Sequence, residues 1–281
     1  MRAGRIGTMQ GRLLPPQDGQ FQCFPRNNWE QEFSNAQAAG LECIEWIYDV
    51  HGEDANPIAT DAGIARMREL IKKYSVQVLS VCADYFMVKT FVRVSPDDRQ
   101  KHLEMLLWLL GRCPLLGINR IVLPCVDNSR IETEEDRVIV TGIIRQALPV
   151  AEANCVEIHL ETSLEPRTFA AFLEQLSHPM LMANYDSGNS SSLGYHPAEE
   201  FAAYGNRVGS VHIKDRIKGG GTVPLGKGDA NFRELFECLR KVNYDRDYIL
   251  QVAREMPGNE VTWLGNNRKI LLEMLDGKFP K

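Results

Sequence analysis

The chain has 281 residues, 44% of them hydrophobic and 25% charged, and its formal net charge at pH 7 is −5. This composition is typical of a globular protein and argues against a disordered or fibrous chain. The mildly acidic total disfavours nucleic-acid partners, and no membrane span is expected because no apolar run approaches the roughly 18–20 residues of a transmembrane helix.

Short apolar or β-branched runs alternate along the chain with longer segments of helical periodicity. In chain order, the predicted strands span residues 5–9, 42–47, 76–82, 119–123, 156–161, 181–186, 208–214 and 248–252. The predicted helices follow them one by one, at residues 29–39, 61–74, 96–110, 134–154, 166–176, 197–203, 231–241 and 260–275. Strand–helix units therefore account for most of the chain.

The ends of several predicted helices have the residues that helix ends favour. Ser95 precedes Pro96, so a cap residue stands before a proline at the first helical position. Thr133 precedes three acidic residues in the same way, and Gly40 and Gly117 stand where helices are expected to end. No segment rich in proline, glycine or serine divides the chain, so we expect residues 1–281 to form a single domain.

Strict alternation of strand and helix predicts a parallel sheet in an α/β fold, either closed as a barrel or doubly wound. Eight units in a chain of this length is typical of a TIM barrel, which needs about 250 residues. A dinucleotide-binding sheet would show GxGxxG after its first strand, and residues 7–11 read GTMQG instead. We therefore predict a single (β/α)₈ TIM barrel.

The seven cysteines are an odd number without CxxC spacing, and several lie inside apolar runs. Buried free thiols in a reducing compartment are expected, which favours a cytoplasmic location. The first ten residues contain two arginines but no apolar core, so no secretion signal is predicted. Aromatic residues on the early loops, such as Trp29, are compatible with a homo-oligomer, but the sequence does not decide the oligomeric state.

Polar residues recur near the ends of the last four predicted strands. Side chains two apart on a strand share a face, and in a barrel one face lines the interior. The residues expected to face inward are His159, Glu161, Asn184, Asp186, Ser210, His212, Lys214 and Gln251. Barrel enzymes have their active sites at this C-terminal end of the strands. These strand ends are therefore the predicted functional site.

A divalent metal ion would offset the cost of burying these polar groups. Glu161, Asp186, His212 and Gln251 would supply two carboxylates, an imidazole and an amide, which suit manganese, magnesium, cobalt or zinc. Each residue alone has an ordinary explanation: His212 as a hydrogen-bonded residue, Asp186 as a turn former, and Glu161 as the start of the next helix. Because the residues share one register, we predict a site for one divalent metal ion.

Five short motifs connect the chain with a known family. They are GLECIEW at residues 40–46, LE at 160–161, YDSGN at 185–189, VHIKD at 211–215 and GKGD at 226–229. Together they resemble the xylose-isomerase-like TIM barrel superfamily, which includes sugar and sugar-phosphate isomerases and epimerases, a dehydratase and apurinic endonucleases. The resemblance covers nearly the whole chain.

The resemblance implies that Glu161, Asp186, His212 and Gln251 hold the metal. In the ketose 3-epimerases of this superfamily the first and last ligands are normally both glutamates, which exchange protons on opposite faces of the substrate. Here the last is Gln251, and an amide can bind a metal but cannot act as a base at ordinary pH. Either another acid replaces it, with Glu255 and Glu45 as candidates, or the reaction needs only one acid.

Further residues near the predicted barrel mouth are candidates for binding substrate. Lys214 and Lys227 could hold a hydroxyl, carboxylate or phosphate, although a solvated basic loop is an equally good interpretation. Arg254 could contact an anionic substrate, and Glu45 and Asn189 complete the predicted set. Residues 13–28 form a long insertion after the first strand, which we expect to cover the site.

The predicted function is a metal-dependent isomerase or epimerase of a small sugar or sugar phosphate. Glu161 removes a proton beside a metal-polarised carbonyl, a metal-stabilised enediolate forms, and Lys214 and Glu255 are further catalytic candidates. Proton return at the neighbouring carbon gives isomerisation, whereas return to the same carbon from the other face gives epimerisation. A dehydratase of a polyol or keto sugar is the main alternative. Abasic-site cleavage, which the net charge of −5 disfavours, and a non-catalytic sugar-binding barrel are the others.

Overall fold

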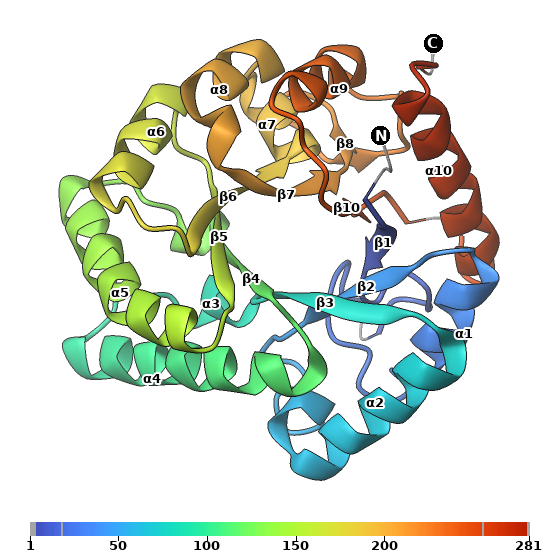
Figure 1. The fold of residues 1–281 in the computed structure, drawn as a ribbon, viewed down its shortest axis with the longest axis horizontal. Helices are drawn as coiled ribbons and strands as arrows, with labels where there is room; N and C mark the ends of the chain where they lie inside the picture. The colour runs from blue at the N-terminus through green and yellow to red at the C-terminus, as the bar shows by residue number, and fades with distance from the viewer. Residues whose placement is uncertain (1–3, 18, 255, 280–281) are drawn as a thin grey trace.

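The computed structural model describes residues 4–17, 19–254 and 256–279, and parallel strands close into a barrel at its centre (Figure 1). Around the barrel the order is β1 (Ile6–Met9), β10 (Tyr248–Leu250), β7 (Val208–Ile213), β6 (Leu181–Asp186), β5 (Glu157–Thr162), β4 (Arg120–Cys125), β3 (Gln77–Cys82) and β2 (Cys43–Ile47). Every neighbouring pair is parallel, and β1 pairs with both β10 and β2, which closes the ring. The predicted (β/α)₈ TIM barrel is confirmed.

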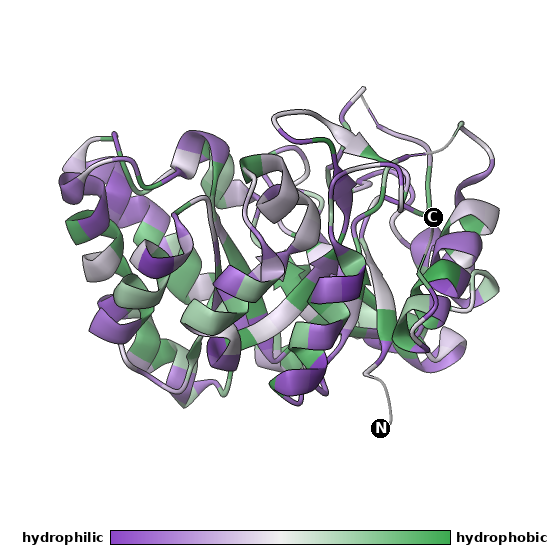
Figure 2. Cartoon of the chain, turned by 90° about the horizontal axis from the view of Figure 1, so that it is seen from above, coloured by the Kyte–Doolittle hydropathy of each residue, from purple (hydrophilic) through white to green (hydrophobic). Residues whose placement is uncertain are grey.

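Helices surround the barrel (Figure 1). The longer ones are α1 (Gln31–Ala38), α2 (Asp61–Tyr74), α4 (Pro96–Arg112), α5 (Glu134–Ala153), α6 (Pro166–Gln175), α8 (Pro197–Tyr204), α9 (Phe232–Lys241) and α10 (Glu260–Leu275). Two begin with the predicted caps, since the hydroxyls of Ser95 and Thr133 each accept a backbone N–H three residues later at 3.1 Å. Hydrophobic and hydrophilic positions alternate along the helices (Figure 2), as the buried Ile64, Met67 and Leu70 of α2 illustrate.

Several short elements lie in the connections. They are 3₁₀ turns at Pro57–Ala59, Cys113–Leu116, Asp127–Ser129 and Gly205–Arg207, the helices α3 (Tyr85–Val88) and α7 (Ser187–Leu193), and the hairpin of β8 (Asp215–Arg216) and β9 (Thr222–Val223). The sequence does not predict α7, because a helix of 7 residues rich in serine lacks a clear hydrophobic period. Asp186 starts it, since its carboxylate accepts the N–H groups of Gly188 at 2.9 Å and Asn189 at 2.8 Å.

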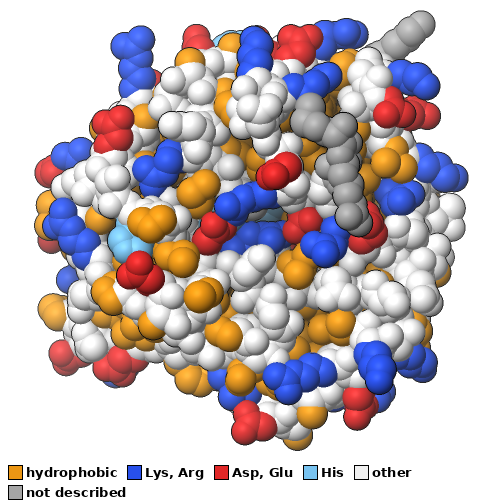
Figure 3. Space-filling model, in the orientation of Figure 1, with side chains coloured by type: hydrophobic (Ala, Val, Ile, Leu, Met, Phe, Trp, Pro, Cys, Tyr) orange, Lys and Arg blue, Asp and Glu red, His pale blue; other side chains and the backbone are white. Residues whose placement is uncertain are grey.

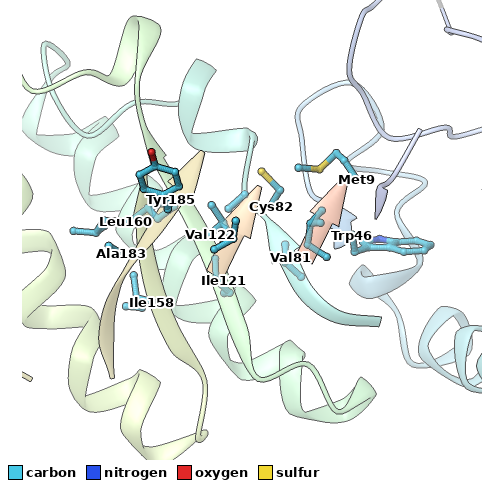
Figure 4. Close-up of a cluster of buried hydrophobic side chains, with 14 of the residues drawn as sticks. Met9, Trp46, Val81, Cys82, Ile121, Val122, Ile158, Leu160, Ala183 and Tyr185 are labelled. Atoms are coloured by element: carbon cyan, nitrogen blue, oxygen red, sulfur yellow. The ribbon is translucent and has the colours of Figure 1, made fainter. Parts of the chain in front are cut away.

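A hydrophobic layer between the strands and the helices holds the barrel together, and Figure 4 shows part of it. Ile158, Leu160 and Tyr185 lie in this layer, on the strand faces that the sequence predicts to point away from the interior. Tyr185 confirms that direction, because its ring centroid lies 5.1 Å from that of Phe201 on α8. Burying each large aliphatic side chain contributes about 1.5–3 kcal/mol. This packing leaves the alternate, polar residues of the same strands to face inward.

The connection between β1 and α1 is held by two charged side chains, the half-buried Arg254 and the buried Glu32. Arg254 donates hydrogen bonds to the backbone oxygens of Gly11 at 2.8 Å, Leu14 at 3.0 Å and Phe21 at 2.7 Å. The guanidinium of Arg254 thus binds the loop, and its predicted contact with an anionic substrate stays a prediction. Glu32 of α1 is fully buried and accepts the Gly11 N–H with its two carboxylate oxygens at 2.9 and 3.0 Å.

Glu32 makes the stability of the fold depend on pH. Burial raises the pKa of its carboxyl from an ordinary 4.5 to about 7, against the opposing effects of the Gly11 N–H and of Arg254. Because the pKa is higher in the folded chain, the stabilisation is complete below the unfolded value and is lost as pH rises through about 7. We expect the melting temperature of wild type to fall from pH 5 to pH 9 more than that of Glu32→Gln, which keeps an acceptor for Gly11. Parallel curves of melting temperature against pH would contradict this assignment.

The cysteines are reduced thiols, as expected, and all are buried except Cys155, which is exposed. Among the helices of the described residues, none combines the length and the apolar character that crossing a bilayer requires.

Candidate active site

Three of the predicted metal ligands converge at the C-terminal ends of neighbouring strands. Glu161 lies on β5, Asp186 on β6 and His212 on β7, and one ligand atom from each lies within 4.8 Å of the others. Nδ1 of His212 is 3.5 Å from Oε2 of Glu161 and 3.8 Å from Oδ2 of Asp186. All three side chains are buried. Two carboxylates and an imidazole at this spacing fit a small divalent cation.

The other ring nitrogen of His212 is bound by Glu45 of β2. Oε1 of Glu45 lies 2.7 Å from Nε2, and both side chains are fully buried. Burial alone would lower the pKa of His212, but the carboxylates of Glu45, Asp186 and Glu161 outweigh burial and raise this pKa well above its ordinary value. A carboxylate on one imidazole nitrogen orients the ring and leaves the other nitrogen for a metal. Glu45 thus contacts the imidazole of His212 on the side away from Glu161 and Asp186, and its predicted substrate contact stays a prediction.

Lys214 lies directly beside this cluster. Its Nζ is 3.5 Å from Oδ2 of Asp186, 3.2 Å from Oδ1 of Asn189 and 3.3 Å from Oε1 of Gln251. Burial opposes ionisation of Asp186, but Lys214 and His212 outweigh it and lower the pKa of that carboxyl to about 2. Acidic and basic side chains also gather near the centre of the face shown in Figure 3. The predicted strand-end residues are therefore brought together as a charged group.

Gln251 connects the cluster with the first loop. Its Oε1 faces Lys214, and its Nε2 donates to Oε1 of Gln22 at 3.0 Å. Gln22 in turn donates to Oδ2 of Asp84 at 2.7 Å. Gln22 therefore brings the segment after β1 next to the ends of β10 and β3, and the covering of the site by this segment stays a prediction. The role of Gln251 as a fourth metal ligand stays a prediction.

Two asparagine side chains hold Glu161. Asn189 of α7 donates to Oε1 at 2.6 Å, and Asn184 of β6 donates to Oε2 at 2.7 Å. Asn189 also accepts a hydrogen bond from Nη1 of Arg216 at 2.8 Å. The predicted substrate-binding residue Asn189 thus contacts the carboxylate directly, and α7 is the element that brings it there.

Two predicted site residues are not placed with this group. Lys227 is exposed on the loop after β9, and no bond of its side chain joins it to the described strand-end residues. Glu255 lies outside the described residues, so its predicted catalytic role stays a prediction.

Asp84 also lies near the site but is not predicted from the sequence, and burial raises the pKa of its carboxyl to about 6. Asp84 lies two residues after Cys82, the last residue of β3. Residues two apart along a strand share a face, so the alternation used for the other strands would have indicated Asp84 as an inward-facing acid.

Asp215 explains why the VHIKD and GKGD motifs occur together. Its buried carboxylate accepts the N–H groups of Gly226 at 2.8 Å, Gly228 at 2.9 Å and Ala230 at 3.1 Å. A side chain at Gly228 would put its Cβ 2.2 Å from Oδ1 of Asp215, so glycine is required there. The first motif therefore fixes the loop that contains the second.

Replacing Asp215 with alanine is expected to destabilise the fold by about 3 kcal/mol, because it leaves several buried donors without a charged acceptor. The matched control is Asp229→Ala, whose carboxylate in the same loop accepts the N–H of Lys218 at 2.7 Å. That variant should lose about 1 kcal/mol. Urea unfolding measures both free energies, and equal losses would contradict the role given to Asp215.

A cavity of about 330 Å³ opens next to the cluster. It is lined by Val126, Asp127, Arg130, Thr162, Ser163, Asn189, Ser192, Leu193 and Arg216. Asn189 is shared between this cavity and the carboxylate of Glu161. The volume lies at the lower end of the range of about 300–1,000 Å³ that small-molecule sites have, and most of the lining residues are polar or charged.

Comparison with known proteins gives concordant matches. Residues 33–273 match the model of the family described as xylose isomerase-like TIM barrel. The putative L-ribulose-5-phosphate 3-epimerase SgbU of Haemophilus influenzae is 22% identical over 273 residues, which are 91% of this chain and 91% of that protein. The L-ribulose-5-phosphate 3-epimerase UlaE of Salmonella paratyphi A is 24% identical over 250 residues, 82% of this chain and 84% of that protein.

Solved structures show the same fold at low sequence identity. The IOLI protein with a bound zinc atom has a TM-score of 0.77 and 14% identity, covering 99% of this chain and 100% of that one. An L-ribulose 3-epimerase has a TM-score of 0.75 and 15% identity, covering 98% and 95%. A xylose isomerase-like TIM barrel protein of Mycobacterium smegmatis in complex with magnesium has a TM-score of 0.73 and 17% identity, covering 99% of each chain.

Proposed function

This chain belongs to the xylose isomerase-like TIM barrel family, and we propose that it is a divalent-metal-dependent epimerase or isomerase of a small keto sugar or its phosphate. The observation that supports this most is the convergence of Glu161, Asp186 and His212 at the C-terminal end of the barrel. Two relatives named as L-ribulose-5-phosphate 3-epimerases match most of the chain, which favours epimerisation over isomerisation.

The residues present fit a metal ion. Glu161, Asp186 and His212 would hold it, with Gln251 as the proposed fourth ligand. His212 would bind through Nδ1, because Glu45 already contacts the other nitrogen of the imidazole. When bound, a manganese, magnesium, cobalt or zinc ion would polarise the substrate carbonyl and acidify the neighbouring C–H group.

Glu161 is the proposed base that removes this proton. Its carboxylate has two oxygens, each held by one asparagine amide, which sets the direction of its lone pairs. A base held in one geometry loses little entropy on reaching the transition state. Asn184 and Asn189 therefore orient Glu161, and Asn189 also stays a proposed substrate-binding residue.

Lys214 is the proposed second proton-transfer residue, on the side of the substrate opposite Glu161. Its Nζ lies 3.3 Å from Oε1 of Gln251. The amide of Gln251 cannot exchange a proton, so the neighbouring Lys214 is proposed to do so in its place. From there it can donate a proton to the substrate or hold a substrate oxygen. Glu255 stays a second candidate for this role.

Dehydration is the second candidate function, and Lys214 is the observation that favours it. An ammonium group beside a bound sugar can protonate a hydroxyl as it leaves, after Glu161 has removed the neighbouring proton. The two reactions share their first step and differ in their products.

Proton exchange with deuterated solvent tests these functions. The protein, loaded with manganese, is incubated in D₂O with ketopentoses, ketohexoses and their phosphates, and the products are analysed by NMR. We expect deuterium at C3 of one ketose together with its epimer, and none after treatment with a chelator. Deuterium at C1 or C2 would indicate an isomerase, and loss of a hydroxyl would indicate a dehydratase. Absence of exchange with every sugar in the presence of metal would contradict the proposal.

A further inference from the structure

A continuous row of buried hydrogen bonds runs through the inside of the barrel toward the candidate metal site. It begins at Glu157 of β5, whose Oε2 lies 2.8 Å from Nε2 of His159. Nδ1 of His159 lies 2.8 Å from Oγ of Ser210 on β7. Ser210 donates to Oδ1 of Asn184 on β6 at 2.6 Å. His159, Ser210 and Asn184 are each at most 4% exposed, so these bonds are shielded from bulk solvent.

The row ends between the proposed base and a proposed metal ligand. Nδ2 of Asn184 lies 2.7 Å from Oε2 of Glu161 and 3.2 Å from Nδ1 of His212. The amide nitrogen of Asn184 thus sets where the carboxylate stands relative to the imidazole. Among the described residues, Glu157, His159 and Ser210 form their side-chain hydrogen bonds with one another, with Asn184 and with Arg246.

The carboxylates at the two ends of the row determine which atoms donate. An ionised carboxylate only accepts, so the Asn184 side chain must turn its nitrogen toward Glu161 and its oxygen toward Ser210. The single hydroxyl hydrogen of Ser210 then points at Asn184, and its oxygen accepts the hydrogen on Nδ1 of His159. The carboxylate of Glu157 also only accepts, so Nε2 of His159 carries a hydrogen as well and the imidazole donates from both nitrogens. A donor at the Nδ1 position of residue 159 is therefore needed for Asn184 to keep this orientation.

The far end of the row is held rigidly. Glu157 forms an ion pair with Arg246, including a bond from Nη2 to Oε1 at 2.9 Å. The imidazole of His159 packs against the backbone of Gly209, where an added Cβ would lie 2.6 Å from its Cε1. Glycine at position 209 therefore allows the ring to lie in this place.

From this geometry we propose that His159 and Ser210 are positioning residues for the metal site. They act through Asn184, whose amide sets the place of Glu161 beside His212. This inference rests on the proposed function, because it assigns the row to the same metal-dependent reaction. Residues that orient metal ligands from outside the coordination sphere typically change metal affinity or activity by about 10–100-fold when they are replaced.

A matched pair of substitutions at residue 159 tests the proposal. His159→Asn puts an amide nitrogen close to the former Nδ1, whereas His159→Leu has almost the same shape and no donor. Both variants lose the contact with Glu157 equally, so their difference reports the donor to Ser210. We expect His159→Asn to bind Mn²⁺ within about threefold of wild type, and His159→Leu to bind it about tenfold more weakly and to have a kcat about tenfold lower, with KM unchanged.

Calorimetric titration with Mn²⁺ alone measures the affinity without any substrate, and steady-state kinetics at saturating Mn²⁺ separates kcat from KM. Equal Mn²⁺ affinity and equal kcat in the Asn and Leu variants would overturn the inference and leave the proposed function intact. If wild type itself binds no Mn²⁺, the proposed function fails and the inference fails with it. Should the Leu variant not fold, Ser210→Ala replaces it in the comparison. That variant is expected to show the same weaker binding and lower kcat, and wild-type values in it would overturn the inference.

Discussion

Glu161→Gln is expected to lower kcat by about a thousandfold at saturating metal, within the range of about 10²–10⁴ that a positioned acid or base contributes. The amide oxygen can still accept from Asn184 or Asn189, but an amide cannot take up the substrate proton. Loss of one carboxylate from the cluster with Asp186 and His212 should also weaken metal binding, so the rate is measured across a metal titration.

The matched control for Glu161→Gln is Glu165→Gln, the same substitution four residues later. Glu165 is exposed and accepts the N–H of Thr168 at the start of α6, a bond that glutamine can also accept. Its kcat should equal that of wild type. A Glu161→Gln protein with more than a tenth of the wild-type kcat at saturating metal would exclude Glu161 as the base.

Glu45→Leu is expected to weaken Mn²⁺ binding by about 10–100-fold, although Glu45 is not a ligand. The carboxylate lies 2.7 Å from Nε2 of His212, and without it the buried imidazole loses the group that orients Nδ1 toward Glu161 and Asp186. Calorimetric titration of the purified proteins measures the loss.

Glu45→Gln separates the hydrogen bond from the charge in this prediction. Glutamine keeps an acceptor for Nε2–H but removes the negative charge beside His212. Its Mn²⁺ affinity should lie between those of wild type and Glu45→Leu. If Glu45→Leu binds Mn²⁺ as tightly as wild type, His212 does not depend on Glu45 for its orientation.

Alternation along the strands was sufficient to predict much of the site. In β5, β6 and β7 the outward apolar residues, such as Leu160 and Tyr185, pack under the helices, and this places Glu161, Asp186 and His212 on the inner face. The period of two is a local property of a strand, so it can be seen in the sequence. The predicted cluster of these three side chains follows from that period and from closure of the barrel.

Contacts across the barrel could not be predicted in the same way. Glu45 and His212 are 167 residues apart, and nothing local shows that β2 and β7 face each other closely enough for their side chains to meet. Arginine is a residue type that often binds anions, yet the guanidinium of Arg254 donates hydrogen bonds to three backbone oxygens of the first loop. Which partner a long charged side chain finds depends on tertiary packing and not on its sequence neighbours.

Metal content tests most directly whether Glu161, Asp186 and His212 hold a divalent metal ion, as we propose. Elemental mass spectrometry of purified wild type beside His212→Ala, each after addition of manganese or zinc and removal of unbound ions, gives the number of ions per chain. We predict about one ion per chain in wild type and none in His212→Ala, because removal of the imidazole breaks the cluster whose ligand atoms lie within 4.8 Å of one another. Absence of metal from both proteins, or equal metal in both, would contradict the claim.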